Sequence, residues 1–527
     1  FYFYCFISLL SLCHFIVQVV DRKRKLVSAA VLEKPLAHCD SSQLGADSKQ
    51  CPRPYGVDAF VDAAIVVVKK YISQDVRTPP LMISSLARGG KTTALNALFV
   101  ALKELNGVRP VIVSFNGNSG FVKGLGETCC EAFLRVVAAQ FVSNPKGIFS
   151  CTEEALETHF GEATIVLLID ELNALCAMLD EDLSLLLKKM FLDRPNRYLV
   201  FTSHYPMEVD VGFPFTGGAS GRVCEKVQLP RCTDVDKLRG MADECQALQP
   251  CRVAMYSGIP SLIYLASINS LSIQERFDNK TFSMTGFDDT TVQDKFVCEL
   301  LEGTAMIRDF DIFSCVDPGG KFMFPVAYIK CIIGRMDNSI AYGVREVVQQ
   351  LETYSGQYET GKDWECIVLL ALLLRCFRAT KNTYNLFDRV PLNPQVVKFV
   401  LLPSNCTTLE GARRELAVQA GISSSCVVIA YPTATKFPFY DSMLLVRSGD
   451  QNKYIGLQMK LGNEYPAGGS QSPNTDEWNG GSFWVRGRAT ETSGITNNGW
   501  VYLTKEELTR FLGYSLGTLY PATWHTV

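Results

Sequence analysis

Histidine is scarce in this chain, and its cysteines lack the spacing of a zinc site. The 527 residues contain five histidines. Cysteine pairs such as Cys129 with Cys130, or Cys224 with Cys232, do not fit the paired patterns that structural zinc requires. The 19 cysteines are odd in number and scattered. We therefore expect reduced, mostly buried thiols, which are typical of an intracellular protein.

The chain also has no excess of positive charge. Its 51 lysines and arginines are balanced by 54 aspartates and glutamates, which gives a net charge of −3. No global basic field therefore points to nucleic acid, and any such contact would be a local patch. The length and the 47% hydrophobic content are sufficient for sizeable cores, so we expect roughly three or four domains.

The first twenty residues carry no formal charge, and two interpretations of them stay open. The run Phe1–Val20 is just long enough to span a bilayer, and a basic cluster, DRKRK, follows it. A secretory signal would have its positive charges before the apolar run. Because the chain starts with Phe, residues 1–20 fit an artefactual extension as well as they fit a membrane anchor. RKRK would equally serve as a weak nuclear signal, and residues 21–54 are basic and polar, as expected of a linker.

A phosphate-binding loop is predicted between a strand and a helix in LMISSLARGGKTTALNAL, Leu81 to Leu98. Glycines let the backbone N–H groups approach phosphate oxygens, and Lys91 would reach the outer phosphates. Thr92 would place its hydroxyl on magnesium. Ser85 replaces the usual first glycine of the motif, which predicts a strained loop or a reduced affinity. The residues expected to bind the nucleotide are Arg88, Gly89, Gly90, Lys91, Thr92, Thr93 and Asp170.

A matching acidic element follows in IVLLIDEL. Ile165–Ile169 is apolar without alternation, as a central parallel strand should be. Asp170 would join Thr92 in the magnesium shell, and Glu171 would orient or deprotonate the attacking water. Alone, Asp170 and Glu171 would be read as an acidic pair at a helix N-terminus. The upstream lysine and threonine favour the nucleotide interpretation.

Two more strands are predicted in residues 55–230. Val111–Phe115 is the extra strand expected when the strands that precede the phosphate loop and Asp170 are not neighbours. Tyr198–Ser203 ends in polar residues, where Ser203 or His204 would sense the terminal phosphate. Alternating strands and helices predict a doubly wound α/β sheet with its ligand at the carboxyl edge. This order resembles the AAA+/STAND side of the P-loop NTPases.

Residues 231–390 are predicted to be a helical lid or winged-helix-like region. SGIP at Ser257–Pro260 resembles the helix start of a STAND lid. The apolar run Trp364–Ala379 is bounded too closely by charges to cross a membrane, so we expect a buried helix of this lid region.

Residues 391–527 change in character to strands separated by turns, which predicts an α+β domain. Gln458 and Lys460 share one strand face and would point towards Asp441 across a hairpin. An Asp, a second oxygen ligand and a Lys form the constellation of metal-dependent nucleases of the restriction-endonuclease fold, with Glu410 or Glu415 as the helical acid. Glutamine is a poorer metal ligand than glutamate, so an ordinary solvated strand face is the alternative.

A second polar strand follows in GSFWVRGR. Trp484, Arg486 and Arg488 share one face there and would stack on bases and contact phosphates. Equally, they would belong to an edge strand whose long side chains lie over apolar surface.

Several segments together resemble the Crinkler–RHS class, and most closely the retrotransposon hot spot proteins of trypanosomes. They are RGGKTT, VIVSFNG, LLIDELNAL and FLDRPNRYLVFTSH, so the resemblance covers roughly residues 80–268 and the C-terminal region more loosely. The resemblance implies a P-loop NTPase joined to a nuclease-like domain, in which Asp441, Gln458 and Lys460 are members or remnants of the site. It also implies a nuclear, chromatin-associated protein of a family whose copies are often degenerate, as Ser85 suggests here.

The sequence therefore predicts an ATPase that uses Mg²⁺, in the nucleus or cytoplasm, whose hydrolysis cycle drives or gates a C-terminal module acting on DNA or RNA. ATP is preferred to GTP because no Asn-Lys-x-Asp guanine motif follows the core. The alternatives are a nucleotide-binding scaffold without turnover and, if residues 1–20 are genuine, a membrane-anchored ATPase. Assembly around the nucleotide is expected of STAND-like domains, with Arg194, Arg197 and Arg222 as arginine-finger candidates.

Overall fold

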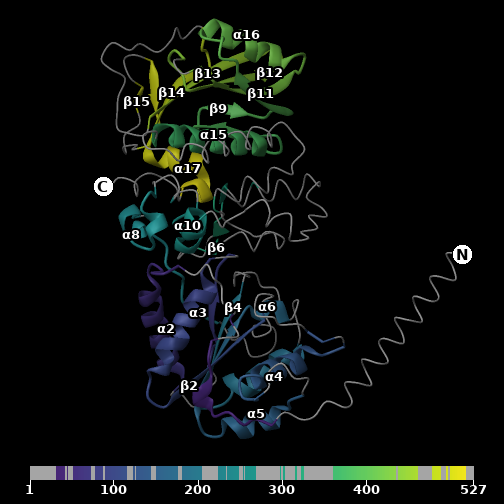
Figure 1. Cartoon of the computed structure of the whole chain (residues 1–527). Coiled ribbons are helices and arrows are strands. Elements are labelled where there is room, and N and C mark those ends of the chain that lie inside the picture. Colours follow the sequence, from purple (N-terminus) through teal and green to yellow (C-terminus); the bar gives the residue numbers. More distant parts are fainter. Residues whose placement is uncertain are drawn as a thin grey trace, which may run out of the picture. The chain divides into compact units, whose positions relative to one another are not determined.

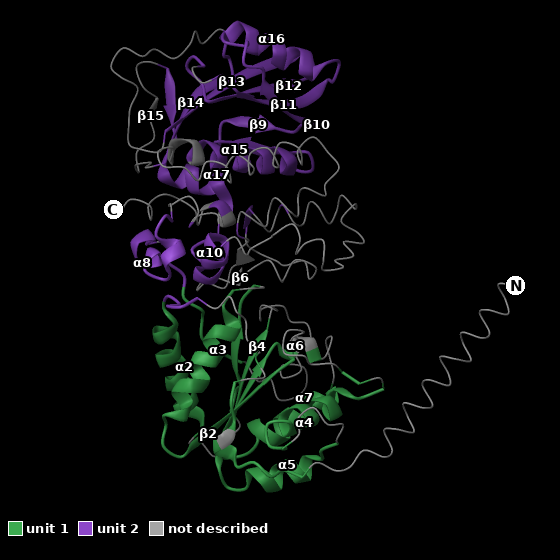
Figure 2. Cartoon of the chain, viewed as in Figure 1, with its two compact units in different colours: residues 1–50, 56–230 green, residues 51–55, 231–527 purple. Residues whose placement is uncertain are grey.

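The computed structural model divides the chain into two compact units. The first comprises residues 1–50 and 56–230, and the second comprises residues 51–55 and 231–527 (Figure 2). The structure describes residues 31–41, 44, 51–72, 78–86, 89–115, 123–124, 126–143, 150–175, 181–203, 224–232, 234–248, 253, 256–268, 297, 301–302, 315–316, 322–323, 325, 360–434, 437–460, 477–487, 494–495 and 499–517. The apolar run of residues 1–20 lies outside them. In the described part of the chain, no helix is both long and apolar enough to cross a membrane.

The first unit is built around a five-stranded sheet in the order β2-β3-β4-β1-β5, with every neighbouring pair parallel. The strands are β1 (Leu81–Ser84), β2 (Val108–Ser114), β3 (Thr164–Asp170), β4 (Arg197–Ser203) and β5 (Glu225–Lys226). The predicted parallel α/β sheet is thus present. The strands before the phosphate loop and through Asp170 are indeed not neighbours. β4 separates them, whereas the predicted extra strand, β2, lies beside β3 at the sheet edge.

Helices cover both faces of this sheet, as its continuous apolar strands require. α2 (Val57–Ile72) and α3 (Lys91–Lys103) lie on one face, and the helices that follow β2 lie on the other (Figure 1). Those helices are α4 (Cys129–Ala138), α5 (Glu153–Phe160), α6 (Leu172–Leu175), α7 (Glu181–Leu187) and the π-helical turn η4 (Lys188–Leu192). A single 3-10 turn, η1 (Leu36–His38), precedes them. Side chains from both helical layers and all of β1 to β4 form one buried core.

The second unit opens with short helices and small hairpins. These are α8 (Val235–Arg239), η5 (Asp243–Cys245), α10 (Pro260–Ser267), the hairpin β6 (Cys315–Val316) with β7 (Phe322–Met323), and the hairpin β8 (Tyr384–Leu386) with β9 (Val390–Leu392). Residues 231–390 were predicted to be a helical lid or winged-helix-like region, and the structure describes two hairpins there in addition to the helices. The predicted boundary after residue 390 falls inside β9.

A seven-stranded mixed sheet follows, in the order β10-β11-β12-β13-β14-β16-β15. Its strands are β10 (Val396–Leu402), β11 (Ser425–Pro432), β12 (Ser442–Ser448), β13 (Gln451–Lys460), β14 (Gly481–Arg486), β15 (Gly494–Ile495) and β16 (Trp500–Tyr502). β11, β12 and β13 form an antiparallel meander, and β10, β14 and β16 add to it in parallel. An α+β arrangement is therefore present in this region.

Helices cover both faces of this second sheet as well. α16 (Leu409–Ala420) packs on one face, while α15 (Thr360–Ala379) and α17 (Lys505–Gly517) lie on the other (Figure 1). Trp364 of α15 donates from its indole Nε1 to the Val485 carbonyl at 3.2 Å, and Tyr431 donates to Glu365 at 3.0 Å. The helix assigned from the sequence to the lid region therefore belongs to the layer beneath this sheet. A helix that is apolar all round must be buried, but its sequence does not say against what.

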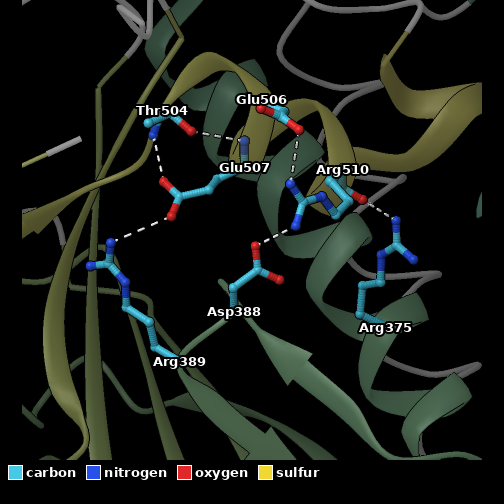
Figure 3. A network of polar contacts seen from close by, with 7 residues as sticks. All are labelled: Arg375, Asp388, Arg389, Thr504, Glu506, Glu507 and Arg510. Carbon is cyan, nitrogen blue, oxygen red and sulfur yellow. Dashed lines mark hydrogen bonds and ion pairs between the residues drawn. The ribbon is translucent and has the colours of Figure 1, made fainter. Parts of the chain in front are cut away.

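α17 is joined to the β8–β9 hairpin by aromatic and polar contacts. The Phe387 ring lies 4.8 Å from the rings of both Phe483 and Phe511, measured between centroids. Around it, Arg510 binds Asp388, and Arg389 binds Glu507 (Figure 3). The Arg510 and Asp388 side chains are about half exposed, so we assign most of the stabilisation to the buried ring.

Candidate functional site

The predicted phosphate loop lies at the carboxyl edge of the first sheet, between β1 and α3. Gly90 is the residue before α3 and has φ 89°, a left-handed conformation that glycine adopts without strain. A side chain at Gly89 would put its Cβ 2.9 Å from the Leu86 carbonyl oxygen. Both glycines are thus required by the backbone. Ser85 does not have a positive φ, so the structure gives no left-handed strain at the position where a first glycine was expected.

Lys91 is 4% exposed and points back over the loop. Its Nζ donates to the carbonyl oxygens of Ser85 at 2.9 Å and Leu86 at 2.8 Å. Thr93 follows it in the first turn of α3, half-buried. Arg88, also predicted here, lies outside the described residues. The loop therefore places the buried Lys91 ammonium and the N-terminus of α3 side by side. Positive charge at a helix N-terminus suits an anion.

Asp170 is the last residue of β3 and is completely buried. Three hydroxyl groups donate to its carboxylate: Thr92 at 3.1 Å, Thr202 at 2.9 Å and Ser114 at 3.3 Å. Burial and the neighbouring Glu171 raise the pKa of Asp170, while the Thr202 and Thr92 hydroxyls and Lys91 lower it. The structure therefore brings Thr92 and Asp170 together across 78 residues of sequence.

Glu171 follows Asp170 in an unusual backbone conformation. Its φ is 54°, in the left-handed region that a residue with a side chain seldom occupies. Its N–H donates to the Thr202 Oγ1 at 2.7 Å. Glu171 is half-buried and directly follows Asp170 at the carboxyl end of β3.

Of the two predicted phosphate sensors, Ser203 and His204, the structure describes Ser203. Ser203 is the last residue of β4 and is completely buried, opposite Ser84 in the parallel register. Its carbonyl accepts from the Ser85 N–H at 3.4 Å. His204 lies outside the described residues.

Two of the three arginine-finger candidates are placed away from this edge. Arg197 begins β4, at the amino edge of the sheet, and donates to the Gly161 carbonyl at 2.6 Å and to that of Ala163. Arg194 pairs with Glu157 at 2.7 Å. Both hold the β3–β4 region together, and Arg222 lies outside the described residues.

The predicted C-terminal site lies where β12 begins and β13 ends. The Gln458 Nε2 and the Met459 N–H both donate to Asp441 Oδ2, each at 2.6 Å. Lys460 is half-buried and is opposite Arg486 in the β13–β14 register. On α16, Glu410 pairs with Arg414, while Glu415 accepts from Gln419 at 2.8 Å. Within the described ranges, no group of three or more histidine, cysteine, aspartate or glutamate side chains could hold a metal ion.

The alternative of an edge strand for Trp484 and Arg486 is wrong, because β14 lies between β13 and β16. The Trp484 ring packs edge-on against Trp500 with 5.2 Å between centroids, and the Arg486 guanidinium lies 5.1 Å from the centre of the Tyr502 ring. Both side chains are buried, which favours packing over apolar surface. Arg488 lies outside the described residues.

No protein-family model and no curated protein matches this sequence. Solved structures that are similar include Cdc6p from Pyrobaculum aerophilum, at 13% identity over 63% of this chain and 83% of that one, with a TM-score of 0.31. Others are the Aeropyrum pernix Orc1 protein in complex with DNA (12% identity, 56% and 96% coverage, TM-score 0.27) and the Thermotoga maritima RuvB branch migration motor (13%, 53% and 96%, 0.26). Likeness at this level is too weak to support an argument about this chain.

One residue that contacts this site was missed from the sequence. Thr202 contacts both Asp170 and the backbone of Glu171, whereas the sequence pattern pointed to Ser203 and His204. The signal was the polar end of the apolar strand. Alternation along a strand says only that residues 202 and 203 face opposite ways, so it left open which of them contacts Asp170.

Proposed function

We propose that this chain is an ATP-binding, magnesium-dependent P-loop ATPase. The observation that carries the proposal is the meeting of Lys91, Thr92, Asp170 and Glu171 at one edge of a parallel sheet. Thr92 and Asp170 are within hydrogen-bonding distance there, and Lys91 is buried in a glycine-containing loop at a helix N-terminus.

The loop fits a nucleotide's phosphates. Left-handed Gly90 turns the backbone into α3, and Gly89 leaves no room for a side chain. The Lys91 ammonium now donates to two loop carbonyls, and phosphate oxygens are stronger acceptors for it. Lys91 and the loop N–H groups would hold the phosphates.

The donor set around Asp170 fits Mg²⁺. A buried carboxylate beside a threonine hydroxyl offers the hard oxygen ligands that Mg²⁺ prefers. Thr92 and Asp170 would hold the ion, which, when bound, neutralises charge on the phosphates. Glu171 would orient the attacking water and accept its proton, and Ser203 or His204 would sense the terminal phosphate.

We further propose that the chain is of the retrotransposon hot spot/Crinkler type and couples nucleotide state to its C-terminal region, which would act on DNA or RNA in chromatin. The sequence resemblance supports this proposal. A nucleotide-dependent homo-oligomer belongs to the same proposal. Cleavage of nucleic acid is not part of it, because Gln458 contributes an amide where a metal site needs an anion.

The test is ATP hydrolysis by the full chain with Mg²⁺, with and without DNA or RNA. Glu171→Gln should lower kcat by about 10²–10⁴-fold while ATP still binds, and Lys91→Ala should abolish ATP binding. Glu154→Gln and Lys69→Ala, on exposed helix positions of the same unit, are the matched controls.

The outcomes separate the candidate functions. Turnover that both site variants lose and both controls keep supports the ATPase, and stimulation by nucleic acid supports the coupling. Binding without turnover by the wild type would favour the nucleotide-binding scaffold. If the wild type does not bind ATP, the proposal is wrong.

A further inference from the structure

Glu171 lies in a backbone conformation that its own residue type does not favour. At φ 54° it leaves the extended path of β3 directly after Asp170. Residues other than glycine are strained in the left-handed region and keep this conformation only where their surroundings hold them. Something at the end of β3 must therefore fix this turn, because the turn decides where the carboxylate points.

The Thr202 hydroxyl provides such a contact. Its oxygen accepts the Glu171 N–H at 2.7 Å and donates its own hydrogen to Asp170 Oδ1 at 2.9 Å. A hydroxyl can do both at once, because it has one hydrogen and two lone pairs. Thr202 is completely buried near the end of β4, so the strand fixes where its oxygen lies.

The two hydrogen bonds join groups with different tasks. Asp170 is the proposed magnesium ligand and Glu171 the proposed base, and they are consecutive residues on a turn. The hydrogen bonds of Thr92 and Ser114 described above are to Asp170, whereas those of Thr202 are to both Asp170 and Glu171. A change that moved Glu171 by about 1 Å would be enough to slow a positioned reaction roughly 10²-fold.

We propose that Thr202 is a positioning residue for hydrolysis: its hydroxyl holds the Glu171 turn in place relative to Asp170, and through it sets the rate of the chemical step. This inference rests on the proposed ATPase function. The contacts of Thr202 in the structure are to Asp170 and to the Glu171 N–H. Its role is to fix the Glu171 carboxylate.

The experiment compares kcat and KM for ATP in the full chain with Thr202→Val and Thr202→Ser. Valine keeps the volume and the strand preference of threonine but removes the hydroxyl, whereas serine keeps the hydroxyl. Thr78→Val is the matched control. Thr78 is also buried in the same unit, and in the described part of the chain its hydroxyl has no hydrogen-bond partner.

We expect Thr202→Val to lower kcat about tenfold or more while KM stays within about twofold, because the loop that binds the phosphates is untouched. Thr202→Ser should restore most of the rate, and Thr78→Val should resemble the wild type. If Thr202→Val does not fold, Thr202→Cys, with its weak donor, is expected to show the same loss of kcat.

Unchanged kcat in a folded Thr202→Val protein would overturn the inference and leave the ATPase proposal intact. So would a rise in KM alone, which would indicate a role in binding, or a failure of Thr202→Ser to restore the rate. If the wild type binds ATP without turnover, the proposed function fails first, and the inference falls with it.

Discussion

Alanine at position 456 would place a methyl group inside the ring of Tyr440. A Cβ on Gly456 would lie 2.5 Å from Tyr440 Cδ1 and closer still to Cε1 and Cζ, whereas carbon atoms prefer about 3.5–4.0 Å. The ring has little room to retreat. Tyr440 is 1% exposed, its centroid lies 4.7 Å from that of Trp478, and its hydroxyl is 2.6 Å from the Ser482 Oγ.

The magnitude follows from these contacts. Overpacking of a close-packed core costs about 1–3 kcal/mol. Breaking the buried Tyr440–Ser482 hydrogen bond adds about 1–3 kcal/mol. Gly456→Ala should therefore destabilise the second unit by about 2–6 kcal/mol. Gly449→Ala is the matched control, because its Cβ would meet nothing within 4 Å and only its φ of 60° is unfavourable, at about 1–2 kcal/mol.

The assay is guanidinium unfolding followed by tryptophan fluorescence. All five tryptophans lie at position 364 or beyond, so the signal reports the second unit alone. The midpoint should fall with little change in slope. A loss for Gly456→Ala no larger than that for Gly449→Ala would refute the reasoning. The reasoning would also fail if Gly456→Ala destabilised a Tyr440→Leu protein, which lacks the obstructing ring, as much as it destabilises the wild type.

Two further predictions concern stability. Phe387→Ala should cost about 3–5 kcal/mol, because this buried ring joins the β8–β9 hairpin to α17, whereas Arg510→Ala should cost no more than about 1 kcal/mol because its ion pairs are exposed. Equal losses in tryptophan-monitored unfolding would contradict this ranking. Burial lowers the pKa of His159, so the unfolded chain takes up that proton first as the pH falls, and the first unit should lose stability below about pH 6.5. His159→Phe should reduce the loss in thermal unfolding between about pH 5.5 and 7.5, and an unchanged pH dependence would show that other groups cause it.

The strands and the phosphate loop of the first unit could be predicted from the sequence because short, contiguous segments determine them. The strand Leu81–Ser84, the loop and α3 are contiguous, and glycine spacing marks the turn between them. Ile165–Ile169 is marked by its length and lack of alternation. The order of the strands across the sheet is not local, which is why the partner between β1 and β3 was not identified as β4.

The second unit was harder to read because contacts distant in sequence determine it. The β8–β9 turn uses Phe387 and Asp388 at φ 52° and 57°, although neither is the glycine that normally signals such a turn. Packing of the Phe387 ring and pairing of Asp388 with Arg510 replace the missing local preference. The sequence of α15 did not indicate which element the helix packs against, because its own apolar residues lie on all of its faces.

In the proposed ATPase, the left-handed turn at Glu171 sets backbone strain against catalysis at one position. Glycine there would relieve the backbone and keep the N–H that Thr202 accepts, but it would remove the carboxylate. A copy of this gene released from selection for turnover would therefore lose little by acquiring glycine at 171 and would keep a loop able to hold nucleotide. Among related chains, we therefore expect glutamate at this position in those that hydrolyse ATP and glycine only in those that bind ATP without hydrolysing it.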